Sequence, residues 1–254
     1  MNSLTLFWVA FACMFGGLLL GMILNALLPD HHLSDDSKDM VKLAIGVIAT
    51  LSALVLGLLI ASAKENFDTV TNELRHTSAK IILLDHVMAQ YGPETRESRD
   101  LLHRSITSAL QRIWPEESHE IGITMAHQPG NDLETIQNKL QQLSPQNEAQ
   151  RGLKSRALQV SAEIADARWL LLGQVGQSSL PWSFLVVLIC WLTIMFGSFG
   201  LFSPRNGTVT FVLFLCALSV AAALFLILEL DQPDRGLIKI SSGPLHNALA
   251  VFGQ

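Results

Sequence analysis

Four long runs of apolar residues constrain this chain more than any other feature. The runs cover residues 4–28, 43–63, 182–202 and 209–228, and none of them contains an Asp, Glu, Lys or Arg. A helix needs about 20 apolar residues to cross the hydrocarbon core of a bilayer. Inside lipid, a helix of this length satisfies its own backbone hydrogen bonds. We therefore predict a multi-pass integral membrane protein with four transmembrane helices.

The charges beside these runs predict the orientation. Residues 29–40 and 203–207 form short loops on one side, and the remaining polar segments lie on the other. The second side carries more basic residues close to the spans, namely Lys64, Arg75, Lys80, Arg168, Arg235 and Lys239 against Lys38, Lys42 and Arg205. Positive residues stay on the cytoplasmic side. We expect both termini to be cytoplasmic, in a bacterial inner (plasma) membrane. The first span lacks a basic leader and a small-residue cleavage site, so we expect it to remain as an anchor.

The long segment between the second and third spans has a helical pattern. Apolar residues follow Phe67 at alternating steps of three and four up to Met88, which is a heptad pattern. A similar pattern runs from Leu153 to Leu171, and Gly92-Pro93 interrupts the helical signal between them. We predict an all-α fold with a cytoplasmic helical bundle inserted between spans two and three. The predicted parts are a first transmembrane pair (1–63), the bundle (64–180), a second transmembrane pair (181–229) and a cytoplasmic C-terminal tail (230–254).

The second span carries a stripe of small residues on one helical face. The stripe consists of Gly46, Thr50, Ala53, Gly57 and Ala61. Small residues let two helices approach closely, so one interpretation is helix packing. The other interpretation is a pore-lining face in an oligomer. In that case Leu51, Leu54 and Leu58 are candidates for a hydrophobic constriction.

Two carboxylates end the fourth span, at Glu229 and Asp231. The turn-forming sequence QPDRG follows them, so one interpretation is a structural clamp at the membrane surface. Arg235 or Lys239 could then pair with these acids. The alternative is that Glu229 and Asp231 form a cation-attracting ring at the cytoplasmic mouth of a pore.

The sequence offers no set of residues for catalysis. It contains no nucleophile elbow, zinc-protease motif or phosphate-binding loop. We therefore expect a non-enzyme without a cofactor or a bound metal. His31 and His32 lie in an acidic loop, and the sequence leaves open whether they bind a divalent ion. The net charge of −5 argues against binding to nucleic acid.

Four stretches of the chain resemble one known family. They are residues 28–68, the stretch containing YGPE at 91–94, LFSPRNGTV at 201–209, and LELDQPDRGLIKIS at 228–241. Together they resemble the bacterial bestrophin-like membrane proteins, domain-of-unknown-function family 4239. The likeness to bestrophins implies four spans, a large cytoplasmic helical part and a pentameric anion channel. Bestrophins carry an aromatic-rich neck in the second span, whereas this span has no aromatic residue before Phe67.

Two functions therefore follow from the sequence. The first is a bestrophin-like homo-oligomeric ion channel in the lipid bilayer, with a pore lined by the second span. The alternative is a non-conducting membrane scaffold or sensor whose cytoplasmic bundle binds a protein partner.

Overall fold

The described part of the chain is built from helices. The computed structural model describes residues 3–27, 35–114, 132–174, 182–203, 206–231 and 240–252, and all regular elements in these ranges are helical. This confirms the all-α prediction. In chain order the helices are α1 (Ser3–Leu27), α2 (Asp35–Tyr91), the short 3-10 helix η2 (Pro93–Thr95), α3 (Arg96–Ile113), α4 (Asp132–Gln142), α5 (Glu148–Gln174), α6 (Trp182–Phe202), α7 (Gly207–Asp231) and α8 (Gly243–Val251).

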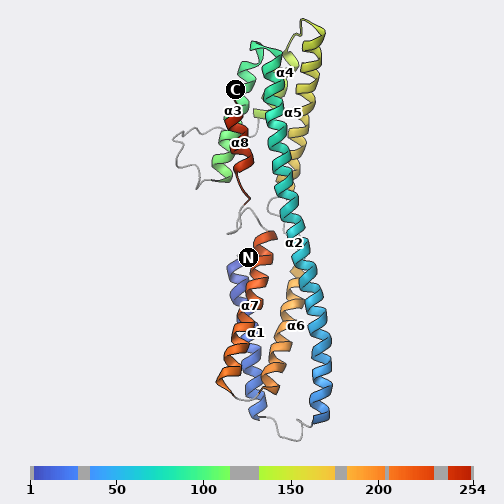
Figure 1. Cartoon of the computed structure of the whole chain (residues 1–254), viewed down its shortest axis with the longest axis vertical. Coiled ribbons are helices and arrows are strands. Elements are labelled where there is room, and N and C mark those ends of the chain that lie inside the picture. The colour runs from blue at the N-terminus through green and yellow to red at the C-terminus, as the bar shows by residue number, and fades with distance from the viewer. Residues whose placement is uncertain are drawn as a thin grey trace. The chain divides into compact units, whose positions relative to one another are not determined.

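Four of these helices are long and apolar enough to cross a membrane. They are α1, the first part of α2, α6 and α7, which are the segments predicted from the sequence. The helix α2 continues without a break from its apolar part to Tyr91 (Figure 1). The chain divides into two compact units, and α2 contributes to both. Unit 1 contains residues 1–67 and 178–238, and unit 2 contains residues 68–177 and 239–254.

Unit 1 has a core formed by α1, α6 and α7, with the apolar part of α2 added to it. A ladder of aromatic rings joins α1 to α7. The Phe7 ring lies 6.3 Å from the Phe225 ring, and the Phe11 and Phe15 rings each lie 5.4 Å from the Phe214 ring. These pairs run in opposite directions along the two helices, so α1 and α7 are antiparallel. Figure 1 shows them side by side.

Glycines bring α1 and α6 into close contact. A Cβ atom placed on Gly17 would lie 2.8 Å from the backbone oxygen of Thr193. A Cβ on Gly21 would overlap the backbone oxygen of Gly197, and one on Gly200 would overlap that of Leu18. The contacts advance together along both chains, so α1 and α6 are parallel. Close backbone packing through small residues is typical of membrane helices.

Unit 2 has its own apolar core. It combines side chains of α2, α3, α4, α5 and α8. The heptad positions of α2 at Val70, Thr77, Ile81, Leu84 and Met88 are all buried, as the pattern predicts. On α5, the buried residues of the predicted seam are Ala157, Val160, Ile164 and Ala167.

Two side-chain contacts give the direction of α5 relative to α2. The Lys80 ammonium lies 3.2 Å from the Glu163 carboxylate, and the Gln150 amide donates a 3.2 Å hydrogen bond to the backbone oxygen of Tyr91. Higher numbers on α2 therefore meet lower numbers on α5. The two helices are antiparallel within unit 2.

The YGPE sequence forms a defined turn after α2. Gly92 has a φ of 136°, a conformation that favours glycine, and Pro93 starts η2. The hydroxyl of Thr95 is buried and lies within hydrogen-bond distance of the backbone oxygens of Met88 (2.5 Å) and Gly92 (2.8 Å), which share its single proton. The turn therefore supplies a donor to the carbonyl of Met88, one of the last four carbonyls of α2, which have no partner within the helix.

Candidate permeation face

The small-residue stripe of α2 faces away from the rest of its own protomer. All five residues are exposed, namely Gly46, Thr50, Ala53, Gly57 and Ala61. A Cβ atom placed on Gly46 or Gly57 would meet nothing within 4 Å. Their small size is therefore not required by packing inside the protomer. The close glycine packing of this chain lies instead between α1 and α6.

The leucines proposed for a constriction are exposed as well. Leu51, Leu54 and Leu58 expose 42%, 66% and 63% of their surface. An exposed apolar side chain in this part of the chain must contact lipid, another copy of the protein or the lumen of a pore. Burial inside the protomer therefore does not account for these leucines.

The opposite edge of α2 packs into the protomer. It consists of Ile45, Ser52, Leu59 and Ala63, all of which are buried. With a rotation of about 100° per residue, the small stripe and the leucines lie on either side of the helix, each about 130° from this buried edge. The mean directions of the two candidate sets are therefore about 90° apart, and Leu54 lies closest to the small stripe.

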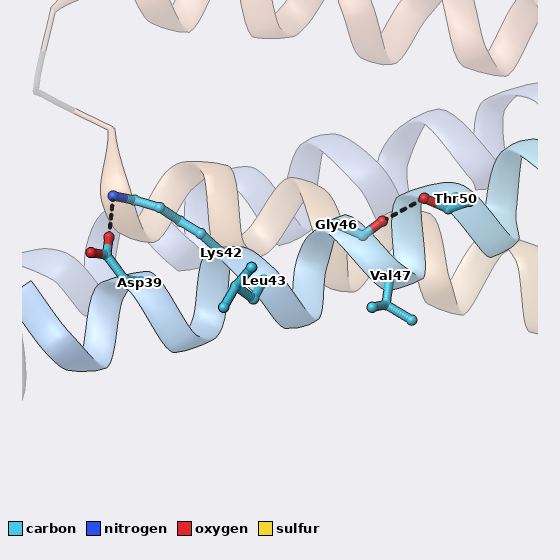
Figure 2. Close-up of a pocket in the computed structure, with 6 residues that line it drawn as sticks. All are labelled: Asp39, Lys42, Leu43, Gly46, Val47 and Thr50. Carbon is cyan, nitrogen blue, oxygen red and sulfur yellow. Dashed lines mark hydrogen bonds and ion pairs between the residues drawn. The ribbon is translucent and has the colours of Figure 1, made fainter.

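A shallow hollow lies on the first turns of α2 (Figure 2). The Lys42 ammonium pairs with Asp39 at 2.9 Å, and the Thr50 hydroxyl donates to the backbone oxygen of Gly46 at 2.9 Å. Leu43 and Val47 project from the helix at the same hollow, 69% and 61% exposed. The exposed face therefore begins with a charged pair and continues with uncharged side chains.

The carboxylates proposed for the cytoplasmic mouth are buried. Glu229 is 3% exposed and Asp231 is 2% exposed. The Ser3 hydroxyl, at the start of α1, donates a hydrogen bond to the Glu229 carboxylate. The Asn66 amide donates to the backbone oxygen of Asp231 at 3.2 Å. The role of these acids at a pore mouth stays a prediction.

Several candidates from the sequence lie outside the described residues. They include His31 and His32, and also Arg235 and Lys239 as partners for the two acids. Within the described ranges, no group of three or more His, Cys, Asp and Glu side chains is placed to hold a metal ion.

The sequence interpretation missed the polar contacts that join the helix ends. Ser3 and Asn66 gave no signal, because single polar residues at the end of an apolar run are common. It also missed the salt bridge in unit 2 between Asp85 and Arg99, with N–O distances of 2.6 and 2.8 Å. The α1–α6 contact did have a signal, since Gly17 and Gly21 form a GxxxG pattern.

Comparisons with known proteins agree with the resemblance seen in the sequence. The chain is similar to two crystal structures of point variants of a bacterial bestrophin homologue from Klebsiella pneumoniae. The first has a TM-score of 0.62 at 16% identity and covers 95% of this chain and 99% of that chain. The second has a TM-score of 0.63 at 15% identity and covers 95% and 97%.

No curated protein matches this chain in sequence. The profile of the bestrophin-like domain, in contrast, matches residues 12–245, which include most of the first span, the other three spans and most of unit 2. The chain is therefore an integral membrane protein that belongs to the bestrophin-like family.

Proposed function

We propose that the protein is an ion channel formed by several copies of the chain, with α2 lining the pore. The main support is the outward face of α2, where a side chain at Gly46 or Gly57 would meet open space and the leucines are exposed. Membership of the bestrophin-like family supports the same function, because bestrophins are channels. The likeness to bestrophins favours a ring of five copies.

The geometry of α2 suggests which residues face the pore axis. In a ring, the pore lies opposite the edge that packs into the protomer. With about 100° per residue, Thr50, Leu54 and Ala61 are the candidate residues that point most directly in that direction. Leu54 is then the foremost candidate for a hydrophobic constriction, since dewetting at such a ring can close a pore.

The other candidates flank this direction. Gly46, Ala53 and Gly57 lie on one flank, and Leu51 and Leu58 lie on the other. In a closed ring the two flanks of each α2 face different neighbours. Leucine side chains of one copy would then pack against the small residues of the next, which explains why both kinds of residue occur on one helix.

We place the protein in the bacterial inner membrane, with both termini and unit 2 in the cytoplasm, because basic residues predominate on that side. Glu229 and Asp231 are then at the cytoplasmic end of the pore. Because both side chains are buried, they would attract ions through their electric field and would not touch them.

The test is ion flux into liposomes that contain the purified protein, with halide and with cation gradients. Gly57→Leu is the test variant, because its site is open within the protomer and lies on the proposed neighbour-facing flank. Gly16→Leu on α1 is the matched control, since a Cβ there also meets nothing within 4 Å. We expect Gly57→Leu to change flux and Gly16→Leu to leave it unchanged.

The other outcomes have clear meanings. If neither substitution changed the flux, the protein would still be a channel, but α2 would not line its pore. No flux in the wild-type protein, under several ionic and pH conditions, would favour the second candidate, a scaffold or sensor. One observation supports that candidate: unit 2 has its own core and exposes 71% of Trp169 on α5, a surface available to a protein partner.

A further inference from the structure

Polar contacts join three helices at one end of unit 1. The start of α1 meets the end of α7 through the hydrogen bond from Ser3 to Glu229. The helix α2 meets the same end of α7 through the hydrogen bond from Asn66 to the backbone oxygen of Asp231, at 3.2 Å. Glu229 and Asp231 are separated by one residue, and both are almost fully buried.

The Asn66 hydrogen bond has a specific structural reason. Asp231 is the last residue of α7, and the last four carbonyls of a helix have no partner within the helix. Asn66 supplies a donor to one of them. Without this donor, a carbonyl belonging to a residue that is 2% exposed loses a partner, which is costly away from water.

The apolar contacts of α2 with unit 1 lie near the same end. Leu59 and Ala63 belong to the core cluster, and Val55 and Leu56 pack against it. Further from Asn66, the buried hydroxyl of Ser52 has no hydrogen-bond partner among the described residues. The α2 side chains that belong to the unit 1 core therefore lie close to Asn66. The earlier turns are buried only on the side of Ile45 and Ser52 and present the exposed face described above on their other side.

In this arrangement, a small tilt of α2 around Asn66 would produce a larger displacement of its earlier turns. Thr50 lies 16 residues before Asn66 in the same helix, which is about 24 Å at 1.5 Å per residue. A tilt of about 5° around Asn66 would move Thr50 by about 2 Å. A change of this size at a narrow pore changes which ions pass and how often.

We propose that Asn66 is a positioning residue, whose hydrogen bond to the end of α7 sets the tilt of α2 and thereby the width of the pore. The hydrogen bond between Ser3 and Glu229 holds the end of α7 against α1, so that α7 provides a fixed point. This inference rests on the proposed channel function for its effect on conduction. Its structural part, the tilt of α2, can be measured independently.

The experiment combines single-channel recording with a distance measurement. Asn66→Leu removes the donor and keeps the size, whereas Asn66→Gln keeps an amide donor. Asn25→Leu is the matched control, because the Asn25 amide also donates to a backbone oxygen, that of Ser203 at 3.5 Å, without involving α2. Recordings in planar bilayers give open probability, conductance and anion selectivity.

Spin labels report the tilt. They are attached at Leu43→Cys on α2 and Leu20→Cys on α1, both exposed sites. The native cysteines Cys13, Cys190 and Cys216 are first replaced by alanine, and labelled protein is diluted with unlabelled protein so that distances within one protomer dominate.

We expect Asn66→Leu to change the open-to-closed ratio about three- to tenfold, the equivalent of one lost hydrogen bond. It should also shift or broaden the distance distribution. Asn66→Gln should keep the open-to-closed ratio and the distance distribution close to those of the wild-type protein. Asn25→Leu should change neither quantity. An Asn66→Leu protein with wild-type gating and distances would overturn the inference. A shifted distance with no current in any variant, wild type included, would support the positioning role and reject the channel.

Discussion

The backbone of Gly21 in α1 lies directly against the backbone carbonyl of Gly197 in α6, so closely that no side chain fits between them. Gly21→Ala should therefore separate α1 from α6 and lower the thermal unfolding midpoint in detergent. Backbone atoms cannot move aside as a flexible side chain can, so we expect a loss of at least about 2 kcal/mol.

Gly16→Ala provides the control for this prediction. A Cβ on Gly16 meets nothing within 4 Å, and alanine in a helix is favoured over glycine by about 0.5–1 kcal/mol. Gly16→Ala should therefore leave the midpoint unchanged or raise it. Equal midpoints for the Gly21 and Gly16 variants would show that the α1–α6 contact has no specific need for glycine.

The proposed pore direction predicts an order among the leucines of α2. Leu54→Thr should raise single-channel conductance or open probability, because a hydroxyl wets an apolar constriction. Leu51→Thr and Leu58→Thr should have smaller effects, since these residues lie on the flank of the helix. The order would be wrong if either flanking variant changed conduction more than Leu54→Thr did.

The salt bridge between Asp85 and Arg99 should stabilise unit 2. The hydrogen bond to Asp85 raises the pKa of the Arg99 guanidinium above its ordinary value. Arg99→Met would leave Asp85, only 7% exposed, without this partner. Removing one partner of a partly buried pair costs about 2 kcal/mol, or about 4–8 °C in the unfolding midpoint.

The pair between Arg151 and Glu148 is a matched comparison in the same unit. Its side chains are 64% and 84% exposed, and exposed pairs contribute about 0–0.5 kcal/mol. Arg151→Met should therefore change the midpoint by at most about 2 °C. Similar losses in the two variants would show that burial does not distinguish the two salt bridges.

Tyr91 gives a pH prediction, and it is the sole tyrosine of the chain. Burial and then the charge of Glu94 raise the pKa of its phenol above 10.0. Because the folded state favours the neutral phenol, this contribution to stability is complete below pH 10.0 and is lost as the pH rises through the raised pKa.

Ultraviolet absorbance of the tyrosinate measures this pKa directly. The native protein should titrate above pH 10.0, and the unfolded protein near that value. Glu94→Gln should lower the native midpoint part of the way, and Tyr91→Phe should remove the signal. A native midpoint at or below 10.0 would contradict the burial of Tyr91.

The sequence was sufficient for the class of protein and for most helices. Uncharged runs of membrane length leave the chain few alternatives, because lipid cannot satisfy open backbone groups. The alternating steps from Val70 to Met88 correctly predicted which face of α2 is buried in unit 2. The turn at Gly92-Pro93 was also readable, since only a few residues accept that backbone conformation.

Only the tertiary structure decided which small residues pack against a neighbour in the protomer. In sequence, the glycines at 17 and 21 and those at 46 and 57 all sit in uniform apolar runs, and the GxxxG spacing of the first pair does not say which helix it meets. The first pair packs against α6, whereas a side chain at the second pair would meet nothing. The hydrogen bonds of Ser3 and Asn66 were likewise invisible, because they join residues 226 and 165 positions apart. Local pattern determines which segments become helices, whereas the pairing of distant faces depends on how those helices pack together.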